Sequence, residues 1–163
     1  MSKIKLSILL LISLSILNCS SSNNIPKTNN KFSIEYIAGG YDGLVLKKQL
    51  ISMLRGFNSY DQNSRKAIKA EINHNTEIFI TNIDNTSDRE KIMSSLKVRV
   101  FDKKLNCVIF KFNDQISQFY IYAPSEKFLS NTKALESIKY NNTEELVKQF
   151  VNDLTKIKFG CLK

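Results

Sequence analysis

Apolar and polar side chains alternate where the folded part of this chain begins. From Phe32 to Ile37 (FSIEYI) the period is two, which is typical of a half-buried strand. Ala38-Gly39-Gly40 interrupts the pattern, Asp42 stands at a helix N-cap position, and apolar residues then recur at helical spacing as far as Gly56. The pattern predicts a strand and then an amphipathic helix whose apolar side consists of Leu46, Leu50, Met53, Leu54 and Phe57.

The period of two returns in the middle of the chain. Residues 67–72 and 77–83 are expected to form one long strand or two, with an interruption at 73–76. The composition of residues 82–90 (NIDNTSDRE) indicates a loop.

Three further strand-like runs follow this loop: SSLKVRVFD, LNCVIFKF and QISQFYIYA. Short polar connections are expected between them, at 102–104 and 113–115. Connections this short join antiparallel neighbours, because parallel pairing needs a crossover of a dozen or more residues. The pattern therefore predicts an antiparallel meander that ends at Pro124.

The C-terminal part is predicted to be helical. Ser130 or Asn131 can cap a run that continues to Ile138, and Asn142 followed by Glu145 resembles a capping box for a second run. The apolar stripe of that second run consists of Leu146, Val147, Phe150, Val151, Leu154 and Ile157.

The order of these elements predicts the fold class. A strand, a helix, an antiparallel meander and a helical tail give an α+β fold, a two-layer sandwich with a mostly antiparallel sheet. We expect the two helices to pack on one face of the sheet and to leave the other face free. Residues 32–163 are expected to form one domain, which is large enough for a single core.

The first residues have the layout of an export signal. Lys3 and Lys5 supply a positive start, and the stretch from Leu6 to Leu17 is apolar except for serines. This stretch is shorter than the roughly 20 apolar residues that a membrane-spanning helix needs. Two alternatives stay open: a buried core helix, which would need a polar face that this run lacks, and an uncleaved membrane anchor.

The signal ends in a cysteine. The segment Ile16-Leu17-Asn18-Cys19 resembles the bacterial lipobox, in which signal peptidase II cuts before the cysteine and lipid is attached to it. Asn18 departs from that pattern, because Gly, Ala or Ser usually precedes the cysteine. We predict a signal peptide at 1–18, lipidation of Cys19 and a flexible tether at 19–31. The next residue is Ser rather than Asp, which resembles the sorting pattern for the outer membrane.

The chain is basic, with a formal net charge of +9 to which the two lysines of the signal contribute. A basic surface favours acidic partners such as nucleic acid, anionic lipid headgroups or phosphorylated glycolipid. Export argues against nucleic acid. Asn, Lys and Ile are all abundant, as in products of AT-rich genomes, so charge alone does not decide between the partners.

The sequence contains no set of residues that predicts catalysis. His74 is the only histidine and lies in the expected break at 73–76, so we interpret it as a solvated loop residue. GxSxG, P-loop, zinc-ligand and CxxC patterns are absent, and we expect no enzyme activity, cofactor or metal. Cys107 and Cys161 can form a disulfide in an oxidising compartment, but a buried thiol at Cys107 and an exposed thiol at Cys161 is the favoured interpretation.

Two long segments resemble members of one lipoprotein family. The stretch IAGGYDGLVLKKQLISML resembles the strand, Gly-Asp turn and Leu-rich helix of alphaproteobacterial LptE proteins. VRVFDKKLNCVIFKFNDQISQFYIYAPSEKFLSNTKALESI resembles their central hairpins and long final helix. The resemblance covers about residues 32–158. Asn141-Asn142, which interrupts the final helix, and the Lys-rich tail after Ile157 depart from the family pattern.

The resemblance implies a non-enzymatic role in the assembly of lipopolysaccharide. Members of the LptE family lie as a plug inside the β-barrel of LptD and help lipopolysaccharide to reach the outer leaflet. For this chain it implies an LptD-like barrel and lipopolysaccharide as partners, and a lipid-anchored location on the periplasmic side of the outer membrane. The alternative is a structural or adaptor lipoprotein of the periplasmic envelope without a glycolipid role.

Basic residues on the predicted strands are the candidates for glycolipid binding. Lys97 and Arg99 alternate with apolar residues, so both should project from one face of the sheet. Lys103 and Lys104 lie in the adjacent turn, and Lys111 lies on the next strand. In a hairpin these residues would form one positive patch, suited to the phosphates of lipopolysaccharide, for which arginine offers a bidentate fork. The alternative is a merely solvated sheet face.

Overall fold

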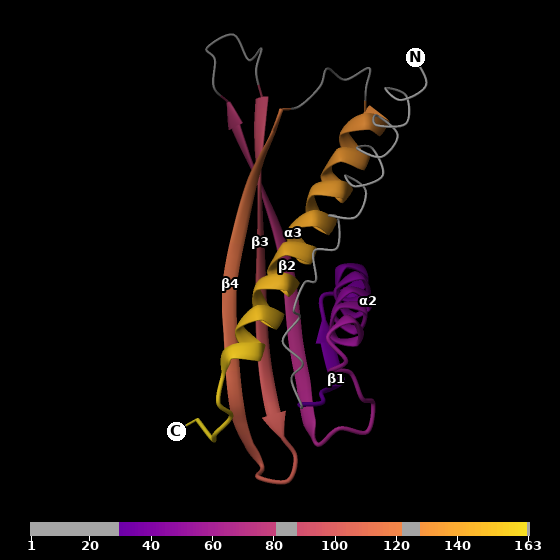
Figure 1. Ribbon diagram of the computed structural model, residues 1–163. Coiled ribbons are helices and arrows are strands. Elements are labelled where there is room, and N and C mark those ends of the chain that lie inside the picture. Colours follow the sequence, from indigo (N-terminus) through magenta and orange to yellow (C-terminus); the bar gives the residue numbers. More distant parts are fainter. Residues whose placement is uncertain (1–29, 81–87, 122–127, 163) are drawn as a thin grey trace, which may run out of the picture.

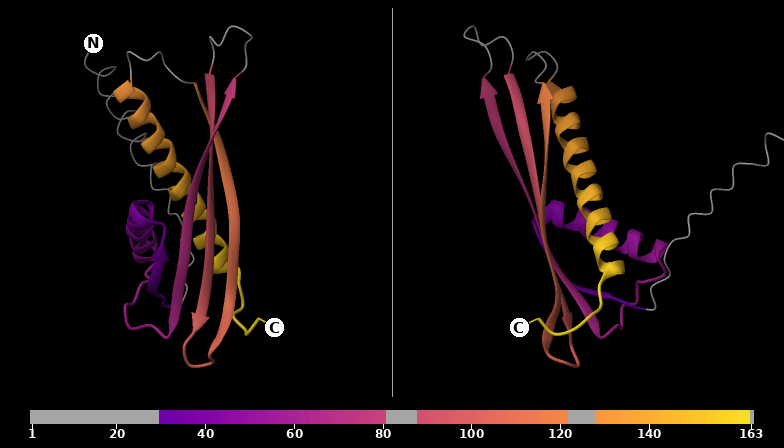
Figure 2. Two further views of the ribbon diagram at one scale, coloured as in Figure 1. Left: turned by 180° about the vertical axis from the view of Figure 1, so that it is seen from behind. Right: turned by 60° about the vertical axis from the view of Figure 1, so that its left-hand side comes forward.

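The computed structural model describes residues 30–80, 88–121 and 128–162. Four strands form one sheet in the order β1-β2-β3-β4 (Figure 1). The two helices α2 and α3 lie on the same side of this sheet (Figure 2). The elements are β1 (Ser33–Ala38), α2 (Gly40–Gly56), β2 (Lys66–Ile80), β3 (Asp88–Asp102), β4 (Cys107–Ile121) and α3 (Phe128–Lys156).

The predicted α+β, two-layer architecture is confirmed. β2, β3 and β4 pair antiparallel, whereas β1 pairs parallel with β2 after the crossover through α2. α3 runs along the long strands and α2 runs across them (Figure 2). Since both helices cover one face, the other face of the sheet is open to solvent.

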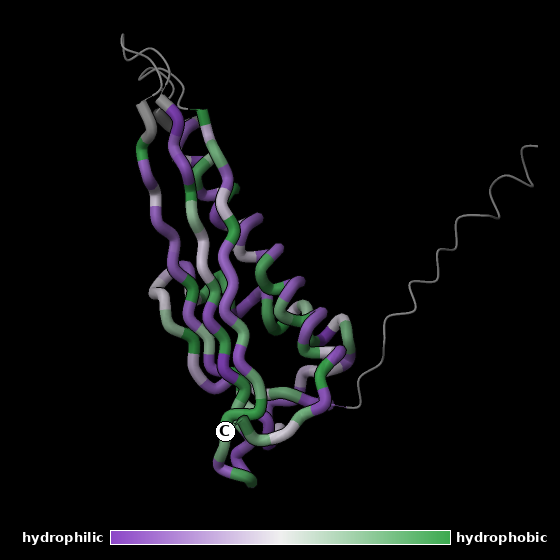
Figure 3. Tube along the Cα trace, turned by 90° about the vertical axis from the view of Figure 1, so that its left-hand side faces the viewer, coloured by the Kyte–Doolittle hydropathy of each residue, from purple (hydrophilic) through white to green (hydrophobic). Residues whose placement is uncertain are grey.

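A single hydrophobic core lies between the sheet and the helices. α2 contributes Leu46, Leu50 and Leu54, all with no exposed surface. Along the strands, residues turned towards the core alternate with hydrophilic ones, so hydropathy changes from residue to residue (Figure 3). On β4 the rings of Phe110 and Phe112 lie 6.1 Å and 5.7 Å from the ring of Phe150 in α3.

Two expected strand breaks are wrong. Residues 73–76 lie inside β2, and residues 113–115 lie inside β4, each with continuous pairing to β3. The polar side chains there are compatible with a strand because Asn73, Asn113 and Gln115 belong to the open face, where water covers them.

The expected division of the C-terminal helix is also wrong, because α3 is continuous through Asn142. Asn142 is completely buried, and its Nδ2 donates to Ser94 Oγ of β3 at 3.0 Å. Thr143 Oγ1 donates to the carbonyl of Lys139, one helical turn earlier, at 2.7 Å. These two polar side chains thus have partners within the helix and across the core, and neither acts as a helix cap.

His74 belongs to the same polar cluster, so its interpretation as a solvated loop residue is wrong. Its Nδ1 lies 2.7 Å from Ser94 Oγ, and its Nε2 lies 3.5 Å from Thr143 Oγ1. Thr143 donates its hydroxyl hydrogen to Lys139 O, so towards His74 it can only accept, from an Nε2–H; in that tautomer Ser94 Oγ donates to Nδ1. Burial lowers the pKa of His74, as does nearby Lys139, whereas Asp42 opposes this shift.

The C-terminal tail is attached to the start of β4 by a disulfide between Cys107 and Cys161. The favoured interpretation of two free thiols is therefore wrong. Leu162 N–H also donates to Val108 O at 2.9 Å. Phe159 lies in sequence between the end of α3 and Cys161. Its ring is 5.7 Å from that of Phe32. The tail thereby closes one end of the core.

The predicted signal at 1–18 lies outside the described residues, as does Cys19. The same holds for most of the predicted tether at 19–31, for most of the loop at 82–90 and for Pro124. Within the described part of the chain, no helix has both the length and the apolar character that a membrane span requires.

Candidate binding surface on the open sheet face

Three cations form one row across the open face of the sheet. Lys69 of β2 is paired in register with Arg99 of β3, and Arg99 is paired with Lys111 of β4. The adjacent row consists of Glu71, Lys97 and Asn113. Like charges directly opposite each other destabilise a sheet, so this row is a cost to the fold.

The rows line a shallow hollow of about 420 Å³. β1 completes it with Tyr36, whose side chain is 62% exposed, and with Ala38. We call this hollow and the cations Lys69, Lys97, Arg99 and Lys111 the basic hollow.

Acidic side chains neutralise only part of the basic hollow. Lys69 Nζ lies 3.3 Å from Glu35 Oε1 and 5.9 Å from the centre of the Phe101 ring. Glu71 accepts a hydrogen bond from Asn73 Nδ2 at 3.2 Å. Among the described residues, neither Arg99 nor Lys111 nor Lys97 forms a salt bridge, and all three are exposed.

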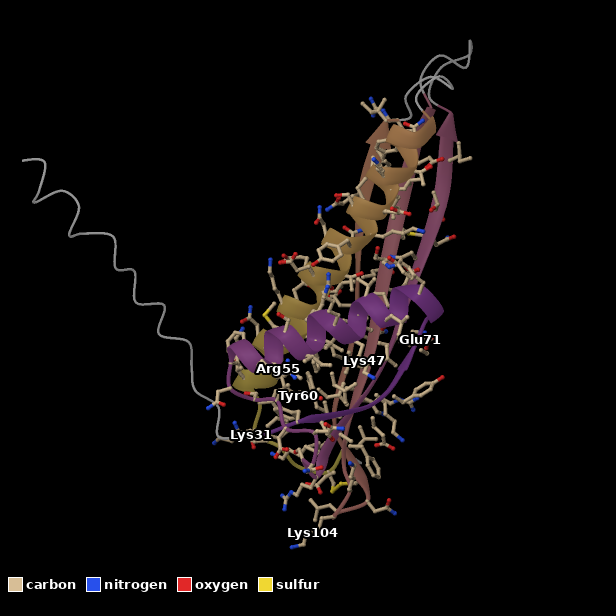
Figure 4. All side chains as sticks on the ribbon, turned by 90° about the vertical axis from the view of Figure 1, so that its right-hand side faces the viewer. Lys31, Lys47, Arg55, Tyr60, Glu71 and Lys104 are labelled. Atoms are coloured by element: carbon tan, nitrogen blue, oxygen red, sulfur yellow. A yellow bond between two sulfur atoms is a disulfide. The ribbon has the colours of Figure 1, made fainter. Side chains whose placement is uncertain are left out.

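The structure separates the five predicted binding residues into two groups. Lys97, Arg99 and Lys111 meet in the basic hollow, as the alternation predicts. Lys103 and Lys104 lie in the turn beyond it, at the end of the hairpin, where Figure 4 labels Lys104. Lys103 is directed towards the segment before β2, with its Nζ 3.5 Å from Ser64 O. These two lysines therefore line no part of the hollow.

Lys69 was not predicted to belong to the site. Its position was detectable, because it alternates with Ile68 and Ala70, which predicts that it faces away from the core. Its neighbours were not detectable, because they depend on the register between β2 and β3.

The open face changes in character along the sheet. Next to the basic hollow, the row Asn73, Ser95 and Gln115 is polar and uncharged. Further along the same face of β4, Phe119 and Ile121 are 63% and 66% exposed. Phe119 is paired with Lys91, which is paired with Glu77, and Ile121 is paired with Arg89, so this part of the face mixes apolar and charged side chains.

Chemically, this surface is suited to the binding of anions. A lysine–arginine cluster can hold phosphate oxygens by charge-assisted hydrogen bonds. Among the described residues, no three His, Cys, Asp or Glu side chains are grouped so that they could hold a metal ion.

This chain is similar to known proteins in its fold and not in its sequence. No protein-family model matches this chain, and no curated protein sequence matches it. A minor lipoprotein from Acinetobacter baumannii superposes with a TM-score of 0.61 at 14% identity, over 85% of this chain and 99% of that one. Bacterial lipoproteins share this fold.

Two further solved structures give the same result. Rare lipoprotein B from Shewanella oneidensis has a TM-score of 0.63 at 11% identity, over 78% of this chain and 95% of that one. An uncharacterised lipoprotein B from Nitrosomonas europaea has a TM-score of 0.56 at 13% identity, over 77% of this chain and 82% of that one. At such identities the likeness establishes the fold and gives no information about the function of the basic hollow.

Proposed function

We propose that this chain is a non-enzymatic, lipid-anchored envelope protein that works with an LptD-type barrel in lipopolysaccharide assembly at the outer membrane. Lipidation of Cys19 is supported by the lipobox-like end of the signal and by the fold shared with bacterial lipoproteins. The barrel partner is supported by the resemblance of residues 32–158 to the LptE family. Mass spectrometry of the membrane-extracted protein tests the anchor, which requires an acylated N-terminal Cys19.

The observation that carries the glycolipid role is the row Lys69, Arg99 and Lys111, which the fold tolerates at a cost. Among the described residues, a carboxylate partner is present for Lys69 and for no other member of this row, so Arg99 and Lys111 are available to an external anion. A phosphorylated glycolipid also has acyl chains, which suit the exposed Phe119 and Ile121 on the same face. The open face therefore offers cations to an anionic head and, further along, apolar side chains beside the further cations Lys91 and Arg89.

Alanine substitutions test this role. Lys97→Ala with Arg99→Ala should weaken binding of purified lipopolysaccharide about tenfold or more, because charge-assisted hydrogen bonds are lost. The control is Lys156→Ala with Lys158→Ala, which removes the same charge from exposed positions outside the hollow. Unchanged binding by the first variant, or equal loss in both, would refute the assignment.

The barrel partner is tested by capture from detergent-solubilised envelopes. The tagged full chain should bring down a large LptD-like barrel. If it brings down only peptidoglycan-associated or inner-membrane proteins, the adaptor interpretation is correct instead.

A further inference from the structure

The outward face of α2 combines exposed apolar side chains with cations. Tyr41 and Leu44 are 78% and 66% exposed, although both are large and apolar in their greater part. The one carboxylate of the helix, Asp42, lines the hollow beside His74 instead. The outward face, as defined here, consists of Tyr41, Leu44, Lys47, Lys48, Ile51, Ser52 and Arg55.

The packing of the core does not require apolar side chains on the outward face of α2. The opposite side of α2 supplies the core with Leu46, Leu50 and Leu54, whereas Leu44 stays 66% exposed and meets β1 at the hollow that it lines with Ile34 and Glu35. A helix whose exposed side interleaves apolar residues with lysine and arginine, and has no acid among them, suits the interface of an anionic membrane. A purely solvated helix face has no need of Leu44 and Ile51 between the cations.

The chain before the domain starts beside this helix. Lys31 Nζ donates to Asn58 Oδ1 at 3.0 Å, just after the C-terminal end of α2. Lys31 and Arg55 lie at the same end of the helix (Figure 4). Fully extended, the chain from Cys19 to Lys31 spans at most about 40 Å, and α2 with its 17 residues is about 26 Å long. An anchor at Cys19 therefore keeps the whole outward face within reach of the membrane surface.

We propose that the outward face of α2 lies on the anionic headgroup surface of the membrane in which Cys19 is anchored. Lys47, Lys48 and Arg55 contact lipid phosphates, while Leu44 and Ile51 enter the interface between them. The proposal rests on the proposed anchor and is independent of the glycolipid and the barrel. Because the tether makes the contact intramolecular, a weak interaction is enough to orient the domain.

The fluorescence of one introduced tryptophan reports this contact, because the natural chain contains no tryptophan. Tyr41→Trp places the reporter on the outward face, and Leu105→Trp, at a 56% exposed position in the turn between β3 and β4 and outside the basic hollow, is the control. The mature chain is coupled through the Cys19 thiol to a maleimide lipid, so the measurement does not depend on natural lipidation. Vesicles contain brominated phosphatidylcholine with or without phosphatidylglycerol, and bromine quenches tryptophan that reaches the interface.

Quenching of Tyr41→Trp is expected on the anionic vesicles and not on the neutral ones, and Leu105→Trp should be quenched on neither. Adding Lys47→Gln, Lys48→Gln and Arg55→Gln should lower the ratio of docked to undocked protein about a hundredfold and abolish the quenching. Lys97→Gln, Arg99→Gln and Lys111→Gln remove the same charge from the basic hollow and should leave it intact.

Equal quenching of the two reporters, or quenching that survives loss of the three helix cations, would overturn the proposal. Absence of Tyr41→Trp quenching on the anionic vesicles would also overturn it, and a change in the fluorescence of this tryptophan on addition of a barrel protein would then assign the face to a protein contact. Failure here leaves the glycolipid assignment untouched, since that assignment is measured on the opposite side of the sheet.

Discussion

Removal of the disulfide should destabilise the domain by an amount that depends on the length of the loop that the disulfide closes. Cys107 and Cys161 have a sequence separation of 54, so their bond closes a long loop that includes all of β4 and all of α3. In the chain-entropy model a closed loop of this length contributes about 4 kcal/mol, because it restricts the unfolded chain. The double variant Cys107→Ser, Cys161→Ser should lose about this free energy of unfolding.

Part of the loss could come from packing of the tail and not from loop closure. Phe159 contacts Phe32, and Lys66 Nζ lies 4.2 Å from the centre of the Phe159 ring. Phe159→Ala in the oxidised protein removes this packing and keeps the loop. Since Phe159 is only half-buried, the variant should lose about 1 kcal/mol.

Urea denaturation followed by circular dichroism measures both effects. The double-serine variant should unfold at lower urea than the wild type, with a larger m value, because its unfolded chain exposes more surface. Mass spectrometry under non-reducing conditions verifies that the wild type carries the bridge. Equal midpoints and equal m values for the two proteins would refute the argument, and a loss as large in Phe159→Ala as in the double variant would assign the effect to packing.

His74→Gln tests the polar cluster around this residue, and Gly39→Ala tests the connection between β1 and α2. Burial lowers the pKa of His74 in the folded state, so the unfolded state binds a proton more readily. The free energy of unfolding is therefore at its full value above pH 6.5 and falls as pH falls below 6.5. Because His74 is the only histidine, His74→Gln should remove this loss between pH 7.5 and 5.5 in urea titrations, and an identical loss in both proteins would contradict the cluster. Gly39 has a φ of 118°, and a Cβ there would lie 2.8 Å from Ile72 O. Gly39→Ala should therefore cost about 1–3 kcal/mol, whereas Gly56→Ala, which has open space around it, should be neutral in the same thermal unfolding assay.

Local patterns predicted the parts of this fold that depend on near neighbours. Alternation along β3 correctly placed Lys97 and Arg99 on one face, because successive side chains of a strand point to opposite sides. The short 102–104 connection likewise predicted an antiparallel pair of strands.

Distant partners explain the errors. Asn142 resembles a cap residue by its neighbours in sequence, but Ser94, far away in the chain, accepts a hydrogen bond from its Nδ2 inside a continuous helix. The cluster Asn113-Asp114-Gln115 has the composition of a turn, yet Asn113 and Gln115 lie on the open face of a continuous strand and Asp114 is exposed on the other side of β4. Cys107 has apolar neighbours, which suggested a buried thiol, but the tail returns to the start of β4 and brings Cys161 to it. None of these partners is visible in a local window of sequence.

The basic hollow was predictable in part for the same reason. Arg99 and Lys111 lie on strands with a short connection, so a hairpin brings them together. Lys69 joins them only through the β2–β3 register, across a loop whose length gives no register in advance. The turn lysines Lys103 and Lys104 were included because they are close in sequence, although they lie beyond the hollow.

The central claim is that the cation row of the open face recognises the phosphates of a glycolipid. The most direct measurement compares the affinity of the wild type for intact lipopolysaccharide and for the same material after enzymatic dephosphorylation, with Arg99→Ala measured in parallel. The account predicts that dephosphorylation weakens wild-type binding about tenfold or more and that Arg99→Ala discriminates much less between the two ligands. Equal wild-type affinity for the two forms, or undiminished discrimination in Arg99→Ala, would contradict it.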